Sequence, residues 1–415
     1  MRFSSFTRPQ AFFLMLITFL KAIIMTLTPL NLDLSFVVSR IDQTSGLTMT
    51  PYGALLKMIV GIWLLVPVDH PVLASAWSID SFNPSFGIYV LVFMIKLPLL
   101  ILDLFTGLLL YFIAVRPELG LTEKKARRVF FLWFLNPYVF LVNEMAGAVD
   151  IYPAFVLILA FALIAARKHV PSACAYAASV ALKLLPFMLL PALAALEKRN
   201  RQRLLILFCG VVGVGIYVAW LLRSGYDPLS ILLQYDPFTQ NLDEYAVLTG
   251  AKTGLGLMSA TLAISYVLVA LKWKSDLGGL LDASLLVLLV YFSFGNWFPQ
   301  LLIWIIPFLT LDYVRCQRVT WSRVFFATFV VSALAVVLLG FPSHFTSNGT
   351  ALLFVPAANT ILKVYASDYA SFAQSDFVQN VVEPVVRSLF LSTCVIYCVE
   401  LAKRNGFFQA ISRLY

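Results

Sequence analysis

The chain has 415 residues, of which 61% are hydrophobic and only 12% are charged, and its formal net charge is +9. Its mean hydropathy of +0.89 is far above what a soluble domain can cover with a polar surface. The composition therefore excludes an ordinary soluble domain and predicts an all-α, polytopic transmembrane helical bundle. In such a protein an excess of Lys and Arg reports loop orientation, so no nucleic acid is expected as a partner.

Many apolar runs are long enough for a helix to cross a bilayer, which takes about 20 residues. The pattern predicts about ten full spans. The expected spans are residues 11–30, 88–115, 128–147, 151–166, 204–223, 253–271, 278–295, 301–314, 322–341 and 384–402.

Basic clusters between these runs predict the orientation, because Lys and Arg concentrate in cytoplasmic loops. With a cytoplasmic N-terminus, every cluster falls on the cytoplasmic side and the C-terminus is cytoplasmic too. Three long segments are then extracytoplasmic loops, at 31–87, 224–252 and 342–383. The first contains a short apolar run at 51–67, which is expected to lie along the interface as a helix or to re-enter part-way. The whole chain, 1–415, is expected to form one membrane domain with no separate soluble domain.

The segment 170–196 lies between two basic clusters, so it has to enter and leave the membrane on the same side. Pro186 and Pro191 interrupt it, and proline breaks a helix. We therefore expect a re-entrant hairpin of two short helices in addition to the full spans. Lys183 stands three residues before Pro186 inside this hairpin, where a charged side chain is a candidate substrate ligand.

Two acids flank a glycine in "VNEMAGAVD", residues 142–150. A turn at Gly147 between two spans would bring Glu144 and Asp150 to the outer mouth of the bundle, where an ionised carboxylate costs less than at mid-bilayer. A substrate-binding role and a role as ordinary interfacial loop charges are equally open from position alone.

Further ionisable residues lie within apolar runs. Lys96 and Asp103 are seven residues apart and share one helix face, so both are expected to face the bundle interior and contact other helices. Lys21, Asp282 and Glu400 are expected to form interhelical hydrogen bonds or to snorkel toward the interface.

Asp33 directly follows the first span, which would hold its carboxylate near the membrane surface. It is a candidate general base for a substrate that arrives in the lipid plane, although its position alone favours an ordinary exposed loop acid. Signatures of soluble metalloproteases, P-loop enzymes, serine hydrolases and dinucleotide-binding domains are absent. The five cysteines fall in spans or cytoplasmic loops, so no disulfide framework is expected.

Several segments, in their order along residues 15–315, together resemble the GT-C glycosyltransferases that use lipid-phosphate sugars. The similarity is to the branch of GPI mannosyltransferase I and its prokaryotic relatives. The pieces are "LDLSF" with Asp33, "PYG" at 51–53, "KLPLLILDLFTGLLLY" at 96–111, "NPYVFLVNEMAGAVD" at 136–150, "ALKLLP" at 181–186 and "NWFPQLLIWIIPFL" at 296–309.

The resemblance implies a GT-C-like fold and an enzyme that moves a sugar, by expectation mannose, from dolichyl or polyprenyl phosphate to an acceptor hydroxyl outside the cytoplasm. Its partners would be the lipid-phosphate sugar donor, membrane lipids and a glycolipid or glycan acceptor, in the plasma membrane or the endoplasmic reticulum. Asp33 would be the general base, and Asp150, Glu144 and Lys183 would orient the acceptor. Asn296 and Gln300 would line the sugar cleft. The candidates for holding the departing phosphate are Arg40, Lys57, Arg223 and Lys252.

The sequence departs from the family in one respect. Asp33 lacks the acidic neighbour that many members carry in the first outer loop, which favours a single-carboxylate base. No cofactor is firmly expected, and a divalent cation, Mg²⁺ or Mn²⁺, is left open.

Two other functions are alternatives. A lipid or sugar transporter or flippase would also use a broken hairpin and intramembrane charges, although no internal repeat relates the two halves. A non-catalytic subunit of a glycosyltransferase complex would keep the fold without the base.

Overall fold

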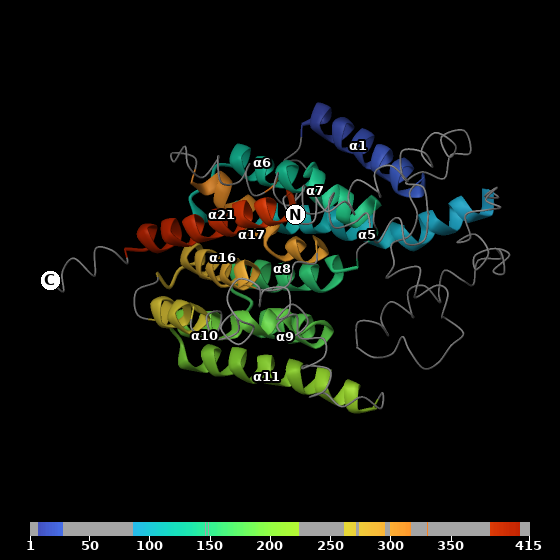
Figure 1. Ribbon diagram of the computed structural model, residues 1–415. Helices are drawn as coiled ribbons and strands as arrows, with labels where there is room; N and C mark the ends of the chain where they lie inside the picture. Colours follow the sequence, from blue (N-terminus) through green and yellow to red (C-terminus); the bar gives the residue numbers. More distant parts are fainter. Residues whose placement is uncertain are drawn as a thin grey trace.

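The structure is a computed structural model, and it describes residues 7–27, 86–145, 147, 149–223, 261–270, 274–294, 299–316, 330 and 382–406. Within these ranges every regular element is helical, as the sequence predicts (Figure 1). The predicted outer loops at 31–87, 224–252 and 342–383 lie almost entirely outside the described residues, as do Asp33 and the predicted span at 322–341.

One row of neighbouring helices forms the body of the bundle. It runs from α1 (Arg8–Leu27) through α5 (Phe86–Ala114), α8 (Ile151–Ala165) and α9 (His169–Leu182) to α11 (Asn200–Arg223), each packing on the next. Figure 1 shows α1 and α11 at opposite edges of this row.

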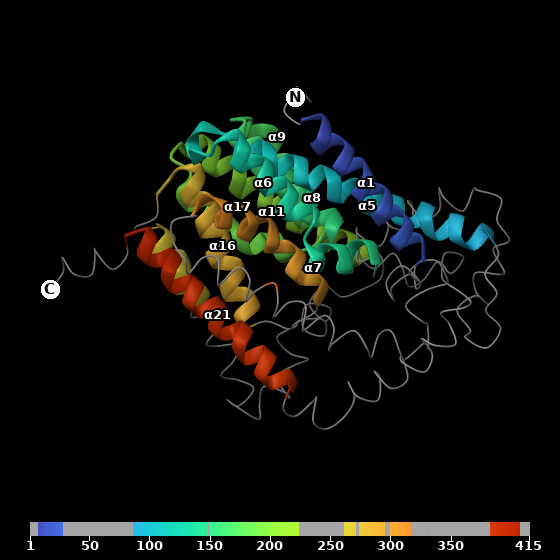
Figure 2. The same ribbon diagram turned by 90° about the horizontal axis from the view of Figure 1, so that it is seen from above.

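A second group of helices packs beside the row. It consists of α16 (Leu277–Phe294), the 3-10 segment η6 (Pro299–Trp304), α17 (Ile306–Arg315) and the C-terminal α21 (Glu383–Arg404). The helix α16 contacts both α17 and α21, and α17 also packs on α6 (Glu123–Phe134). Figure 2 shows α21 running alongside α16 at the margin of the bundle.

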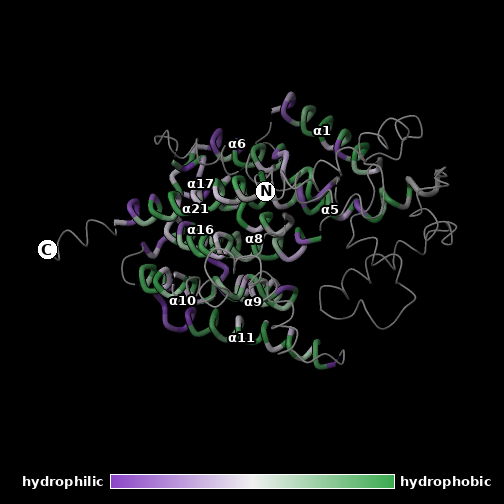
Figure 3. Tube along the Cα trace, in the orientation of Figure 1, coloured by the Kyte–Doolittle hydropathy of each residue, from purple (hydrophilic) through white to green (hydrophobic). Residues whose placement is uncertain are grey.

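The helices at the edges carry large apolar side chains on their outer faces. Phe12 and Phe19 on α1 and Leu204 and Phe208 on α11 each expose more than 60% of their surface, and apolar residues run along most of each helix (Figure 3). Contiguous apolar surface of this kind is unfavourable in water and suits contact with lipid. The chain is therefore a membrane protein, as the composition predicts.

Three described helices are long and apolar enough to cross a membrane, at Arg8–Thr26, Val92–Ala114 and Asn200–Arg223. They coincide with predicted spans. Other predicted spans correspond to shorter apolar helices, such as Ile151–Ala165 and Leu277–Ser293. The count of about ten spans is thus not confirmed.

The predicted hairpin corresponds to α9, the 3-10 turn η5 (Leu185–Leu189) and α10 (Leu190–Leu196). The start of α9 and the end of α10 line one common cavity, so the chain goes out along α9 and returns along α10. The backbone leaves the helical conformation at Lys183, where φ is −152° and ψ is 133°. The break therefore lies three residues before Pro186. Proline, and the residue before a proline, both resist a helical conformation.

The helix α11 packs closely on this hairpin through glycine. A Cβ atom added at Gly213 would lie 2.6 Å from the backbone carbonyl oxygen of Ala177 and 3.0 Å from the Cβ of Val180. No heavy atom lies within 4 Å of the same position at Gly215, one half-turn farther on. The small residue at 213 is therefore required for the contact between α9 and α11.

The two glycines give substitutions of opposite expected effect. Gly213→Ala should destabilise the protein by about 1–3 kcal/mol, because the added methyl group forces α9 and α11 apart. Gly215→Ala should be neutral or stabilising by up to about 1 kcal/mol, since alanine favours the helix and meets no neighbour. Thermal unfolding of the detergent-purified variants measures both. Equal effects at the two positions would contradict this packing.

Candidate functional site

A buried ion-pair triad joins three elements, α1, α5 and η4 (Phe140–Met145). The ammonium of Lys21 on α1 lies 2.7 Å from Oδ2 of Asp103 on α5 and 3.0 Å from Oε1 of Glu144. Glu144 lies in η4, which is a π-helical segment. All three side chains are at most 5% exposed. An isolated charge would be very costly here, so mutual neutralisation is what permits all three to be buried.

The surroundings of the triad are partly aromatic. The Lys21 ammonium lies 4.1 Å from the centre of the Phe134 ring, and a cation over an aromatic face is attracted to it. The indole nitrogen of Trp133 donates to the backbone oxygen of Asp103 at 3.0 Å. Lys96, two helical turns before Asp103, is completely buried and is attracted electrostatically to Glu144. Lys96 thus lies in the field of the same carboxylate that Lys21 contacts.

Some buried polar atoms beside the triad form no hydrogen bond with the described residues. Four buried atoms, Oδ1 of Asp103, Oε2 of Glu144 and both amide atoms of Asn143, have no hydrogen-bond partner among the described residues. Burying such groups unpaired is unfavourable. Asn143 and Glu144 also sit in a π-helical segment, a distortion that is frequent at functional sites.

A second polar centre joins the start of α8 to the hairpin. Asp150, directly before α8, forms an ion pair with Lys183 at the hairpin break. Trp304 at the end of η6 donates its indole N–H to the same carboxylate oxygen at 3.4 Å. Asp150 is 2% exposed, whereas the Lys183 side chain is 33% exposed, so the centre is accessible from the lysine side.

The structure has the predicted turn at Gly147, but both acids are buried, Glu144 completely and Asp150 with 2% of its surface exposed. Gly147 adopts a positive φ of 73°, a conformation that glycine reaches without strain. The turn separates η4 from α8 and directs Glu144 and Asp150 to different partners. Glu144 joins Lys21 and Asp103, and Asp150 joins Lys183.

Two further predicted site residues lie within the described ranges. Arg223 is the exposed last residue of α11, and Gln300 lies in η6. The others, Asp33, Arg40, Lys57, Lys252 and Asn296, lie outside the described residues. Sequence reasoning missed Asn143 and Trp304, and it assigned Lys21 no part in the site. The only sequence signal for Asn143 was a polar side chain directly before Glu144. The only signal for Trp304 was an indole N–H close to Gln300.

A third cluster ties the C-terminal helix to the bundle. Arg404 of α21 lies 3.0 Å from Asp282 on α16 and 2.8 Å from Asp312 on α17. Arg315 contacts the same two carboxylates, and the Tyr397 hydroxyl donates to Asp312. Asp282 therefore forms the interhelical contacts expected from the sequence. This cluster is structural, because its charges are satisfied by one another.

No group of three or more His, Cys, Asp or Glu residues that could hold a metal ion occurs in the described ranges. The divalent cation left open by the sequence gains no ligand set there, and it stays a prediction. All five cysteines are free.

Removal of the triad's cation tests its energetic weight. Lys21→Met should destabilise the protein by about 3–5 kcal/mol, because two carboxylates then lose a shared counter-ion in a buried site. Arg8→Met, which removes an exposed cation from the same helix, should change stability by less than about 0.5 kcal/mol. Unfolding of the detergent-purified proteins measures the difference. A triple variant with Asp103→Leu and Glu144→Met added should recover most of the loss, and similar losses for the two single variants would contradict the triad.

The C-terminal cluster predicts a local effect. Arg404→Ala should loosen α21, because Asp282 and Asp312 are then left to share Arg315 alone. Limited proteolysis should release the C-terminal segment several-fold faster than in the parent protein. Lys403→Ala removes the exposed neighbouring cation and should leave the rate unchanged. A similar rate for both variants would show that the cluster does not hold the helix.

Comparison with known proteins gives one family match. The family model described as GPI transamidase subunit PIG-U matches residues 64–242, which is less than half of the chain. The matched stretch contains α5, α8, the hairpin and α11, together with Asp103, Glu144, Asp150 and Lys183. The comparison with curated proteins gives no match.

This match corrects the expected activity. The sequence analysis predicted a polyprenyl-phosphate-sugar-dependent glycosyltransferase of the mannosyltransferase I branch. The chain is instead similar to a subunit of GPI transamidase, so the prediction of a sugar-transferring enzyme is wrong and the mannosyltransferase branch is not supported. Among the functions considered, the match agrees best with a non-catalytic subunit of a membrane complex.

Proposed function

We propose that this chain is a non-catalytic membrane subunit of a GPI transamidase-type complex in the endoplasmic reticulum membrane. The observation that carries the proposal is the match to the PIG-U family over residues 64–242. The apolar, lipid-facing helices at the edges of the bundle agree with a subunit that works within the bilayer.

The state of the carboxylates supports a binding role rather than a catalytic one. A general base needs a carboxylate that can accept a proton from a bound hydroxyl. Asp150 contacts Lys183, and Glu144 contacts Lys21, so each already neutralises an ammonium group. Such carboxylates are held in place and still accept hydrogen bonds. In this proposal Asp33 has no catalytic role.

The ligand of this subunit is the glycolipid that the complex handles. The partly exposed ammonium of Lys183 suits a phosphate group on the same molecule. Asp150 and Trp304 hold that lysine in place.

Two experiments test the proposal. The first is affinity purification of the tagged full-length chain in mild detergent, followed by quantitative mass spectrometry. It should recover the catalytic subunit of the transamidase at near-stoichiometric ratio. The second is depletion of the chain, which should reduce attachment of GPI anchors to proteins and cause complete GPI lipids to accumulate. Recovery of the chain without the transamidase, or depletion that shortens the glycan of GPI lipids, would overturn the proposal.

A variant separates binding from assembly. Lys183→Met should reduce anchor attachment several-fold in depleted cells while the complex still assembles, because the charge that faces the phosphate is lost. Lys124→Met, which removes an exposed lysine of α6, should restore full attachment. Failure of Lys183→Met to assemble would show that the residue is structural.

A further inference from the structure

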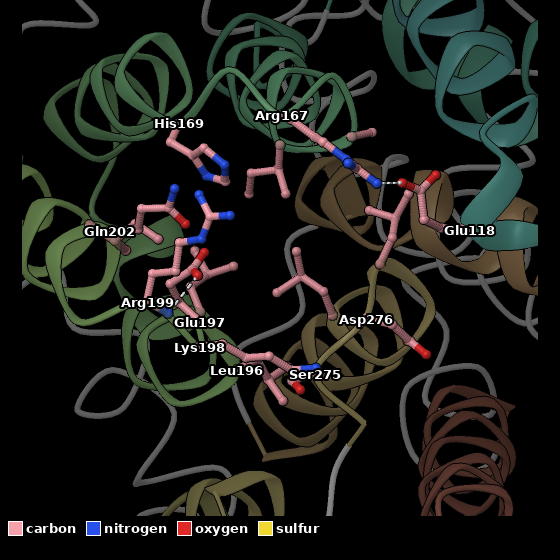
Figure 4. A pocket seen from close by; sticks show the side chains of 16 residues that line it. Glu118, Arg167, His169, Leu196, Glu197, Lys198, Arg199, Gln202, Ser275 and Asp276 are labelled. Carbon is pink, nitrogen blue, oxygen red and sulfur yellow. Dashed lines mark hydrogen bonds and ion pairs between the residues drawn. The ribbon is translucent and has the colours of Figure 1, made fainter.

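A cavity of about 360 Å³ opens at the end of the bundle where the predicted cytoplasmic loops meet (Figure 4). Its lining comes from segments far apart in sequence, including Glu118, Arg167, Arg199 and Asp276. The volume lies within the range of about 300–1,000 Å³ that is usual for pockets that bind small molecules. Neither the triad nor the Asp150 centre contributes a residue to it.

The cavity has two kinds of wall. Its apolar wall consists of Ile164, Ala165, Leu193, Leu196, Ile206, Leu277 and Leu280. The rim is polar and carries both signs of charge. Figure 4 shows His169, Gln202 and Arg199 on one side of the opening and Arg167 with Glu118 on the other. An apolar wall beneath a charged rim fits an amphipathic ligand.

The acids of the rim are already engaged by the protein. Glu118 accepts a hydrogen bond from Arg167 at 3.1 Å. Oε1 of Glu197 accepts the backbone N–H of Arg199 at 3.0 Å. Oδ1 of Asp276 accepts the N–H of Gly279 at 2.7 Å and so caps the start of α16. Each of these carboxylates is thus held in place by a hydrogen bond within the protein.

Two cations of the rim, unlike these acids, have charged groups that are not engaged by the described part of the protein. Within the described residues, the side chains of Lys198 and Arg199 form no hydrogen bond or ion pair with the protein. The lining carries three cations, Arg167, Lys198 and Arg199, and three acids, Glu118, Glu197 and Asp276, and the two cations available to an anionic group are Lys198 and Arg199. A backbone hydrogen bond and the Arg167 guanidinium lower the pKa of Glu118 below its usual value, so that ion pair persists at neutral pH.

The backbone near the rim is also unusual. Arg167 has a φ of 59°, in the left-handed region where a residue other than glycine is uncommon and is disfavoured. Its N–H bonds the carbonyl of Ile164, and the N–H of Lys168 bonds that of Leu163, which closes α8 and directs the Arg167 side chain to the cavity mouth. A conformation of this kind is held in place by the surrounding structure.

We propose that this cavity binds the headgroup of an anionic phospholipid from the leaflet that faces the basic loops. Arg199 and Lys198 contact the phosphate, and the apolar wall contacts the glycerol and the first carbons of the acyl chains. Basic pockets between transmembrane helices are a recurrent form of lipid recognition, and charge-assisted hydrogen bonds from arginine to phosphate are strong. The site lies apart from the glycolipid-binding centre proposed above and does not depend on that function.

Binding of three defined probes to the full-length chain in detergent tests the proposal. The probes are dioctanoyl phosphatidylinositol, dioctanoyl phosphatidylcholine and free inositol 1-phosphate. Phosphatidylinositol should bind at least about tenfold more tightly than either of the others. Equal affinity for phosphatidylcholine would overturn the selectivity for an anionic headgroup. Equal affinity for inositol 1-phosphate would show that the ligand is a free phosphate and not a lipid.

Matched variants locate the site. Arg199→Ala and Lys198→Ala should each weaken phosphatidylinositol binding about tenfold, as expected for loss of one charge-assisted hydrogen bond. Arg201→Ala removes a nearby exposed arginine, in the first turn of α11, that does not line the cavity, and it should leave the affinity unchanged. Thermal unfolding should be the same for all three variants because the residues are exposed. Equal weakening by Arg201→Ala would show a diffuse surface attraction and overturn the site.

Discussion

The described part of the fold depends on the pairing of charges that are buried within an apolar bundle. Lys21, Asp103 and Glu144 come from three different elements, and none of them could be buried there without the others. Their contact determines where α1 lies against α5 and holds η4 in its π-helical form. The same principle operates at Asp282 and Asp312, where Arg315 and Arg404 bring α16, α17 and α21 together. Because apolar packing within lipid gives little directional preference, these polar contacts specify which helices become neighbours.

The need to pair buried charges and polar atoms also accounts for the difference between the polar centres. In the C-terminal cluster, nearly all hydrogen-bonding capacity is used within the protein. Beside the triad, four buried atoms have no partner among the described residues, and at the hairpin Lys183 stays partly exposed. A cluster that is satisfied internally holds helices together, whereas a centre with a partly exposed ammonium can accept a ligand. This distinction, together with the match to a transamidase subunit, separates a binding role from the catalytic role suggested by the carboxylates alone.

Sequence reasoning predicted the all-helical class, the interruption of the hairpin, the turn at Gly147 and the inward orientation of Lys96 and Asp103. Each follows from a local rule about proline, glycine or helical periodicity. It did not predict that Lys21 would pair with two acids 82 and 123 residues away, since the partner of a buried charge is decided by tertiary packing. Nor did it predict that Glu144 and Asp150 would separate, because a six-residue spacing across a turn does not determine which neighbours each side chain meets. The prediction of an enzyme was wrong for a related reason. Glycosyltransferase-like segments describe a scaffold, and a scaffold can be retained without its chemistry.

The position of Arg404 in the chain has a consequence for biogenesis. Asp282, Asp312 and Arg315 are synthesised close together, whereas Arg404 follows 92 residues after Asp312. During that interval two acids share one guanidinium within a newly inserted helical pair, an arrangement of net negative charge in a lipid environment. Insertion of the last helix neutralises it. Insertion of α21 therefore completes the neutralisation of this cluster, and a chain that ends before Arg404 leaves the two acids with one guanidinium between them.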